Sequence, residues 1–123
     1  MRARASNRAW HLAPLLVSLC ASAPRSACEL VMFHSLSCKW CEAWEREVGV
    51  VYDKTTEARA APLRRVDVHN RRPADLRALA PIVYTPTFVL LNDGRELGRI
   101  TGYPGEDHFW GLLGVLLDKQ DAC

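Results

Sequence analysis

The sequence of 123 residues has no internal repeat, no low-complexity tract and no linker between separate hydrophobic regions. It also has no apolar run long enough to span a bilayer, because the longest candidate, residues 12–20, falls short of the roughly 20 residues that a membrane helix needs. A chain of this length can bury one small core. We therefore expect a single domain with a short appendage.

An excess of charge of one sign is also missing from most of the chain. The whole sequence carries 16 Lys and Arg against 14 Asp and Glu, a net charge of +2. Three arginines and no acid lie in residues 1–23, so the remainder has a net charge near −1. Four arginines cluster between residues 64 and 72, but no aromatic residues are interleaved with them as in nucleic-acid-binding surfaces. We expect no nucleic-acid partner.

The first 23 residues have the three parts of a secretory signal peptide. Arg2, Arg4 and Arg8 form a basic head, residues 12–20 an apolar stretch, and residues 21–23 a small-residue cleavage signal. The exact cleavage site stays open between residues 21 and 27. The pattern predicts export to the periplasm and a mature domain over residues 24–123. The alternative is an ordinary amphipathic or disordered N-terminus.

The mature chain begins with a strand pattern followed by a helix pattern. Residues 30–34 form a short, continuous apolar run, which is typical of a strand buried on both faces. Residues 42–52 come next and predict a helix. Starting one residue earlier, apolar side chains recur at steps of three and four: Cys41, Trp44, Val48 and Val51. Ser35 and Ser37 are candidate caps for the start of this helix.

The rest of the chain predicts a strand, a short helix, a hairpin of two strands and a final helix, in that order. Residues 63–68 alternate apolar and polar as a strand does, and residues 73–80 indicate a short helix that ends before a proline. Residues 87–91 and 96–101 flank an Asn-Asp-Gly turn and predict a hairpin. Residues 105–117 predict a packing helix with acids in its first turn. The expected fold class is α/β, with a central mixed sheet of about four strands flanked by helices.

The cysteines offer the most specific chemistry. Five is an odd number, so at least one thiol is left over after any pairing. Cys38 and Cys41 are separated by two residues at the start of a predicted helix, where backbone N–H groups and the helix dipole stabilise a thiolate. We predict that Cys38 attacks a partner's disulfide and that Cys41 resolves the mixed disulfide. Lys39 adds a cation that favours the Cys38 thiolate.

A metal site is the competing interpretation of this pair. Two cysteines at this spacing also supply half of a zinc tetrahedron, and His34 and His69 are candidate further ligands. The chain would then be a non-catalytic metal-binding or redox-sensing module. A second cysteine pair at metal spacing is absent, and the placement between an apolar strand and a helix favours redox chemistry. We therefore expect no metal and no cofactor other than a Cys38–Cys41 disulfide.

Downstream, Thr85 and Pro86 directly precede the strand predicted at residues 87–91. Together with Cys38-Lys39-Trp40-Cys41, this arrangement resembles the thioredoxin superfamily over nearly all of the mature chain. The resemblance implies a minimal thioredoxin-like fold and a cis peptide before Pro86, with the proline facing the disulfide. It also implies that the Thr85 backbone binds a partner polypeptide. The alternative that the sequence permits is a trans proline that opens a strand. We expect Trp40 to contact partners and Trp44 to pack in the core.

Four segments are similar to a narrower group, the small periplasmic thioredoxin-like proteins encoded with bacterial sulfur-oxidation systems: residues 33–48, 60–67, 85–90 and 102–106. The resemblance implies a monomeric reductant that keeps the cysteine of a sulfur-carrier protein active. A reductant in an oxidising compartment needs electrons from a membrane thiol-disulfide donor. The alternatives within this chemistry are cytochrome c maturation and general periplasmic disulfide exchange.

Two features differ from ordinary thioredoxins. Met32 stands where the family carries a buried aspartate that assists proton transfer, and Glu42, Glu45 or water could substitute for it. The mature chain also begins almost at its first strand, so we expect no additional strand and helix before it.

Three cysteines remain outside the pair. Cys20 would leave with the signal peptide. Cys28 and Cys123 lie at the two ends of the mature domain, and domain termini are often close together. A disulfide between them is compatible with the sequence, and so is the alternative, in which one or both are free or Cys28 is linked to another molecule.

Overall fold

The computed structural model describes residues 13–15, 18, 27–119 and 123. The signal-peptide prediction for residues 1–23 falls almost entirely outside these residues and stays a prediction. Among the helices that are described, none combines the length and the hydrophobicity needed to cross a membrane.

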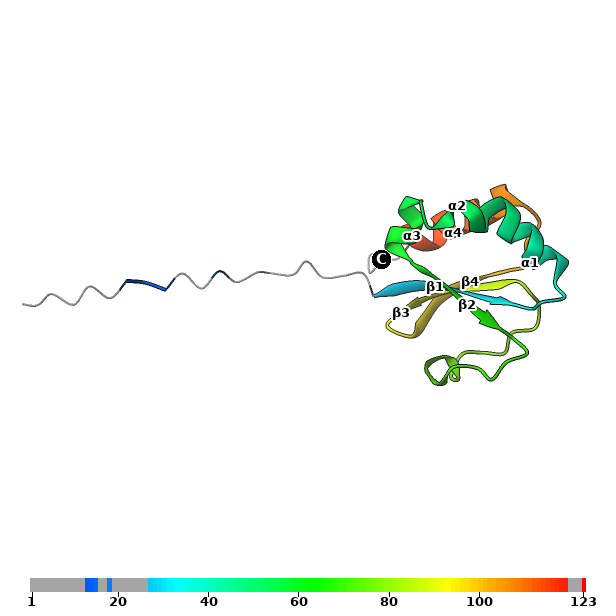
Figure 1. The fold of residues 1–123 in the computed structure, drawn as a ribbon, viewed down its shortest axis with the longest axis horizontal. Coiled ribbons are helices and arrows are strands. Elements are labelled where there is room, and N and C mark those ends of the chain that lie inside the picture. Colours follow the sequence, from blue (N-terminus) through cyan, green and yellow to red (C-terminus); the bar gives the residue numbers. More distant parts are fainter. Residues whose placement is uncertain (1–12, 16–17, 19–26, 120–122) are drawn as a thin grey trace, which may run out of the picture.

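Four strands form one mixed sheet in the order β2-β1-β3-β4 (Figure 1). They are β1 (Cys28–His34), β2 (Leu63–Asp67), β3 (Thr87–Asn92) and β4 (Arg95–Thr101). β1 pairs with β2 in parallel and with β3 antiparallel, and β3 pairs with β4 antiparallel. The apolar run of β1 is explained by its central place, since both of its faces are covered. The sheet prediction is confirmed.

The first helical stretch contains a π-helical segment that the sequence pattern did not indicate. It runs through α1 (Lys39–Trp44), η1 (Glu45–Gly49) and α2 (Val50–Tyr52). A π-helical turn takes up an additional residue and rotates the helix beyond it. The buried face therefore ends on Tyr52, which is fully buried, whereas Val51 is 42% exposed. The assignment of Val51 to the apolar face was wrong for this reason.

In the part of the chain that the structure describes, the α-helices and the π-helical segment η1 cover one face of the sheet (Figure 1). α3 (Thr56–Ala60) begins at Thr55, whose hydroxyl accepts a hydrogen bond from the Ala58 N–H. α4 (Glu106–Asp118) matches the predicted packing helix, and its Phe109 and Leu113 are fully buried. The sequence thus assigned the last helix correctly.

The opposite face of the sheet is covered by the segment between β2 and β3, and the helix predicted there is only a short turn. The 3₁₀ helix η2 (Ala74–Leu76) is its single helical element. A helix of eight residues is marginal without tertiary support. Here the burial of Leu76, with Leu79 and Ile82 packed beside it, requires an irregular backbone that tracks the sheet.

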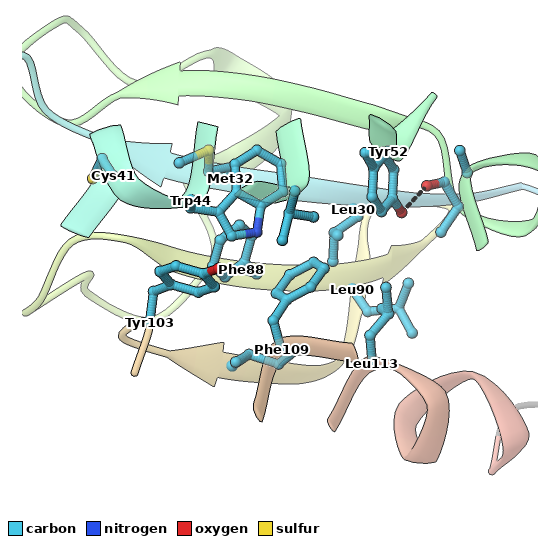
Figure 2. Close-up of a cluster of buried hydrophobic side chains, with 14 of the residues drawn as sticks. Leu30, Met32, Cys41, Trp44, Tyr52, Phe88, Leu90, Tyr103, Phe109 and Leu113 are labelled. Carbon is cyan, nitrogen blue, oxygen red and sulfur yellow. Dashed lines mark hydrogen bonds between the residues drawn. The ribbon is translucent and has the colours of Figure 1, made fainter. Parts of the chain in front are cut away.

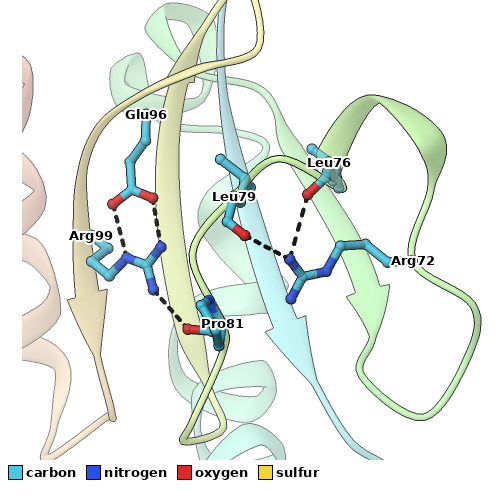
Figure 3. A network of polar contacts seen from close by, with 6 residues as sticks. All are labelled: Arg72, Leu76, Leu79, Pro81, Glu96 and Arg99. Atoms are coloured by element: carbon cyan, nitrogen blue, oxygen red, sulfur yellow. Dashed lines mark hydrogen bonds and ion pairs between the residues drawn. The ribbon is translucent and has the colours of Figure 1, made fainter.

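Two arginine side chains add hydrogen bonds to backbone carbonyls of this segment (Figure 3). Arg72 donates to the carbonyls of Leu76 and Leu79, at 3.5 and 3.1 Å. Arg99 on β4 pairs with Glu96 and also donates to the Pro81 carbonyl at 3.3 Å. Arg72 therefore braces this segment internally, and Arg99 ties it to β4 of the sheet shortly before Thr85 and Pro86.

An aromatic cluster fills the space between the sheet and the helices (Figure 2). Trp44 is fully buried, with ring centroids 5.1 Å from Phe88 and 5.5 Å from Phe109. Its indole N–H has no hydrogen-bond partner among the described residues. Tyr52 lies beside it and donates a hydrogen bond to the Ala61 carbonyl at 2.7 Å. Trp44 is a packing residue, as predicted.

A disulfide joins Cys28, the first residue of β1, to Cys123, the last residue of the chain. Their Cα atoms are 5.7 Å apart and 95 positions separate them in the sequence. Of the two arrangements that the sequence left open, the structure contains the disulfide. The bond closes nearly the whole domain into one covalent loop.

Candidate active site

The Cys38–Cys41 disulfide lies where β1 passes into the first helix. β1 ends at His34, a turn comes next, and α1 begins at Lys39 with Cys38 as its N-cap. The Cys38 sulfur accepts a hydrogen bond from the Cys41 N–H at 3.0 Å. The cap is therefore the cysteine itself and not Ser35 or Ser37, whose hydroxyls lie 3.3 Å from each other.

This geometry favours chemistry at the first sulfur. Cys38 is 9% exposed and Cys41 4% exposed, so the disulfide is reached mainly from the Cys38 side. The Cys41 N–H and the N-terminal end of the helical stretch would stabilise negative charge on the Cys38 sulfur after reduction. Lys39 is exposed in the first turn and adds a positive charge there. The arrangement suits a nucleophilic Cys38 thiolate with Cys41 behind it.

The peptide bond between Thr85 and Pro86 is cis, as the family resemblance implied. Pro86 is buried, and its carbonyl accepts a hydrogen bond from the Gly102 N–H at 2.8 Å. The Thr87 hydroxyl donates to the Tyr84 carbonyl at 2.7 Å and holds the preceding turn. Within the described residues, the backbone N–H and C=O of Thr85 make no hydrogen bond. They are therefore available to a bound polypeptide.

A shallow groove of about 560 Å³ brings Trp40 and Thr85 together, two of the residues singled out in the sequence. Its full lining is Trp40, Tyr84, Thr85, Thr101, Gly102, Tyr103 and Pro104. Tyr103 is nearly buried and donates a hydrogen bond to Glu47. Burial, together with this hydrogen bond, raises the pKa of Tyr103, so the phenol remains a donor. The groove thus has a fixed floor and an aromatic rim.

The sequence did not single out three exposed apolar side chains in the same region. Leu36 is 82% exposed, Val83 77% and Tyr84 67%, and Trp40 is 63% exposed. Leu36 lies in the turn before Cys38, whereas Val83 and Tyr84 directly precede Thr85. The sequence signal that could have identified this surface was the presence of apolar residues in the loops next to the cysteine pair and next to Thr85 and Pro86. Exposed apolar surface around a reactive disulfide favours contact with another protein.

A second hollow, of about 520 Å³, lies beside Cys41. Its lining is Met32, His34, Ser35, Leu36, Cys41, Glu42, Glu45 and Arg46. Met32 is fully buried, so no carboxylate occupies the position where thioredoxins carry their aspartate. Of the substitutes considered, Glu45 is held by Arg65 through two hydrogen bonds of 2.7 and 2.9 Å, and Glu42 is exposed.

The two histidines considered as metal ligands differ in their surroundings. His34 and Cys41 line one hollow, whereas His69 is exposed in the turn after β2. No group of three or more His, Cys, Asp or Glu side chains is placed to hold a metal ion in the part of the chain that the structure describes.

Comparison with known proteins agrees with this geometry. A family described as thioredoxin-like domain matches residues 29–116, which is most of the chain. The chain belongs to the thioredoxin-like family. The reduced periplasmic thioredoxin SoxS from Paracoccus pantotrophus is 40% identical, with a TM-score of 0.71 over 75% of this chain and 97% of that one. No curated protein sequence matches the chain.

More distant thioredoxin-like structures share the fold alone. A Fasciola hepatica thioredoxin is 23% identical, with a TM-score of 0.58 over 74% of this chain and 82% of that one. A mutant thioredoxin from Halobacterium salinarum is also 23% identical, with a TM-score of 0.56 over 75% of this chain and 76% of that one. The thioredoxin-like chain described here is thus more similar to the SoxS structure than to either of these.

Proposed function

We propose that the chain is a periplasmic thiol-disulfide oxidoreductase that works as a reductant of protein disulfides. The observation that carries this proposal is the Cys38–Cys41 disulfide, nearly buried at the start of a helix and surrounded by exposed apolar side chains. A structural disulfide does not need an exposed apolar surface around it. A disulfide that meets partner proteins does.

The reaction begins with both cysteines as thiols. The Cys38 thiolate attacks one sulfur of the partner's disulfide, and the partner's other sulfur leaves as a thiolate and takes a proton from water. Cys41 then gives up its proton and attacks the Cys38 sulfur. The Cys38–Cys41 bond forms, the mixed disulfide breaks and the partner's second thiol is released. Two electrons have moved from the Cys38–Cys41 pair to the partner.

The groove with Trp40, Tyr84 and Thr85 would hold the partner chain during this exchange. The free N–H and C=O of Thr85 can pair with an extended backbone, as an added strand does. Trp40 supplies apolar contact area next to the nucleophile. Both contacts are independent of the partner's sequence near the disulfide. They suit a segment that can extend across the groove.

The partner and the electron source come from the similarity to SoxS. It supports a sulfur-carrier protein, kept active by removal of unwanted disulfides from its cysteine, as the substrate. Return of the chain to its dithiol form requires a reductant, since the periplasm is kept oxidising. A membrane thiol-disulfide transporter would supply these electrons. Export would depend on the predicted signal peptide in residues 1–23.

Covalent trapping tests the proposal. A Cys41→Ser variant, expressed with its N-terminal residues, cannot resolve the mixed disulfide, and it should retain its partner on Cys38. Cys38→Ser is the matched control, because it keeps the fold and the groove and removes the nucleophile. Periplasmic extracts are separated without reductant, and the species that disappear on reduction are identified by mass spectrometry.

Each outcome has a distinct meaning. A sulfur-carrier protein on the Cys41→Ser variant alone would establish the proposed role. Cytochrome c maturation proteins, or many unrelated periplasmic proteins, would favour the alternative roles in disulfide exchange. If both variants capture nothing and the wild-type pair resists reduction and oxidation, the catalytic proposal is wrong. Stoichiometric zinc in the purified protein would then favour the metal-binding module.

A further inference from the structure

We propose that His34 accepts the proton that Cys41 releases before it attacks the mixed disulfide. The proposal rests on the proposed function and assigns the step for which ordinary thioredoxins use a buried aspartate. The residue at that position, Met32, has no group that can take a proton. His34 lies two residues further along the same strand.

Strand alternation places His34 on the face of the sheet that Cys41 faces. Leu30 and Met32 belong to the buried cluster that also contains Cys41, whereas Val31 and Phe33 belong to the cluster on the opposite face. His34 continues the first set, because side chains two residues apart on a strand point to the same face. His34 and Cys41 both line the hollow of about 520 Å³ beside α1.

Cys41 needs such a group because of its surroundings. It is 4% exposed and belongs to the apolar cluster that contains Met32 and Trp44. An apolar environment disfavours a thiolate, so a buried thiol keeps its proton unless an acceptor is near. The hollow has both Cys41 and the basic side chain of His34 in its lining. It also admits water, which can connect the two groups.

The other charged groups around the hollow are less suitable. On the helical side, Glu45 is occupied by Arg65 of β2, and Arg46 is a cation that cannot accept a proton. Glu42 is an exposed carboxylate, which is a weak acceptor near neutral pH.

On the sheet side, Asp67 of β2 is the register neighbour of His34, and its carboxylate accepts a hydrogen bond from the backbone N–H of His69 at 2.8 Å. Among the described residues, no side-chain hydrogen bond or ion pair engages the His34 imidazole. Imidazole is the side chain best matched to proton transfer near neutral pH. Of the groups around the hollow, His34 is therefore the one that is both unoccupied and chemically suited.

The proposed step balances without an additional reactant. The proton moves from the Cys41 sulfur to an imidazole nitrogen of His34, directly or through one water. The Cys41 sulfur then forms its bond to the Cys38 sulfur, and the bond between Cys38 and the partner breaks. The partner's sulfur leaves as a thiolate, and the His34 imidazolium returns its proton to that thiolate or to solvent.

A small aromatic disulfide that releases a coloured thiol separates the two attacks in time. The full-length chain carries Cys20→Ser, with Cys38 and Cys41 reduced and Cys28 still linked to Cys123, as checked by mass after alkylation. In stopped flow, the first equivalent of coloured thiol reports attack by Cys38. The second equivalent reports resolution by Cys41.

We expect His34→Gln to leave the first phase unchanged and to slow the second by at least about tenfold near neutral pH. The pH profile of the second phase should also differ from that of the wild type. Free imidazole should restore the second phase of His34→Ala, because that variant leaves space in the hollow. His69→Gln is the matched control histidine and should behave as wild type.

Three results would overturn the assignment. One is a second phase of His34→Gln with the wild-type rate and pH profile. Another is a slow second phase in Glu42→Gln together with a normal one in His34→Gln, which would make Glu42 the acceptor. The third is an equal slowing of both phases without rescue by imidazole, which would show a structural role. Failure of the proposed function would differ from all three, since the wild-type chain would then release no coloured thiol at all.

Discussion

Removal of the Cys28–Cys123 disulfide should destabilise the domain strongly and leave its exchange chemistry intact. The bond joins residues 95 positions apart. In the chain-entropy treatment, opening a loop of this length frees the unfolded chain by about 4.7 kcal/mol, and measured losses for native disulfides run from about 2 to 5 kcal/mol. We expect a loss of about 3–5 kcal/mol and a fall in Tm of about 15–30 °C for a domain of this size.

The assay is urea unfolding of the double variant Cys28→Ala with Cys123→Ala, compared with the parent chain, both carrying Cys20→Ser and an intact Cys38–Cys41 disulfide. The slope of the free energy against urea should also rise, because the opened unfolded chain exposes more surface. β1 has seven residues, so about 20 Å separate Cys28 from the site at the other end of the strand. The rate of disulfide exchange at Cys38 should therefore stay the same.

Two results would refute this reasoning. A loss of stability below about 1 kcal/mol would mean that the bond contributes little to the constraint of the unfolded chain. A changed exchange rate with an unchanged fold would mean that the second disulfide takes part in the chemistry. A control without substitution is the parent chain with both disulfides reduced, which should reach the stability of the double variant after its Cys38–Cys41 disulfide has been reduced as well.

The remaining predictions concern packing, the partner surface and pH. Trp44→Ala should lower the free energy of unfolding in urea by about 3–5 kcal/mol, because it empties part of the core. Trp40→Ala should change that free energy by less than about 0.5 kcal/mol. It should slow the reduction of protein disulfides and leave the reduction of small disulfides unchanged. Gly98→Val should cost about 1–3 kcal/mol, because a Cβ there would lie 2.5 Å from a side chain of α4; an unchanged urea midpoint would contradict this. A hydrogen bond from Arg99 lowers the pKa of Glu96, so this pair stabilises the fold at neutral pH by about 0.5–1 kcal/mol. The contribution is lost as the pH falls through the lowered pKa. Arg99→Leu should flatten this acid dependence of the urea midpoint.

The chemistry-bearing residues could be found in the sequence because local spacing determines them. Cys38 and Cys41 need only a strand and a helix on either side to form a disulfide at a helix start, and both elements have strong apolar patterns. The hairpin was equally predictable, since Asp93 and Gly94 both adopt positive φ angles, of 49° and 78°, as a tight turn between strands requires. The cis peptide before Pro86 came from family resemblance and not from the local sequence.

Several features depended on contacts between distant segments, and local patterns could not predict them. The π-helical segment from Glu45 to Gly49 rotates the helix so that Tyr52 and not Val51 is buried, and no local pattern announces such a rotation. The expected helix at residues 73–80 gave way to an irregular segment, because Leu76 is buried on the sheet and Arg72 bonds its carbonyl. In each case packing outweighed local helix preference.

The sequence by itself determined the chemistry and the order of the elements, because a dithiol at a helix start, an apolar central strand and a glycine turn are all properties of neighbouring residues. Only the tertiary structure decided which of the remaining cysteines pair, which charged groups are occupied, and which side chains share a hollow with Cys41. Those properties depend on residues far apart in the chain, such as Cys28 and Cys123 or Glu45 and Arg65, and folding alone brings them within contact distance.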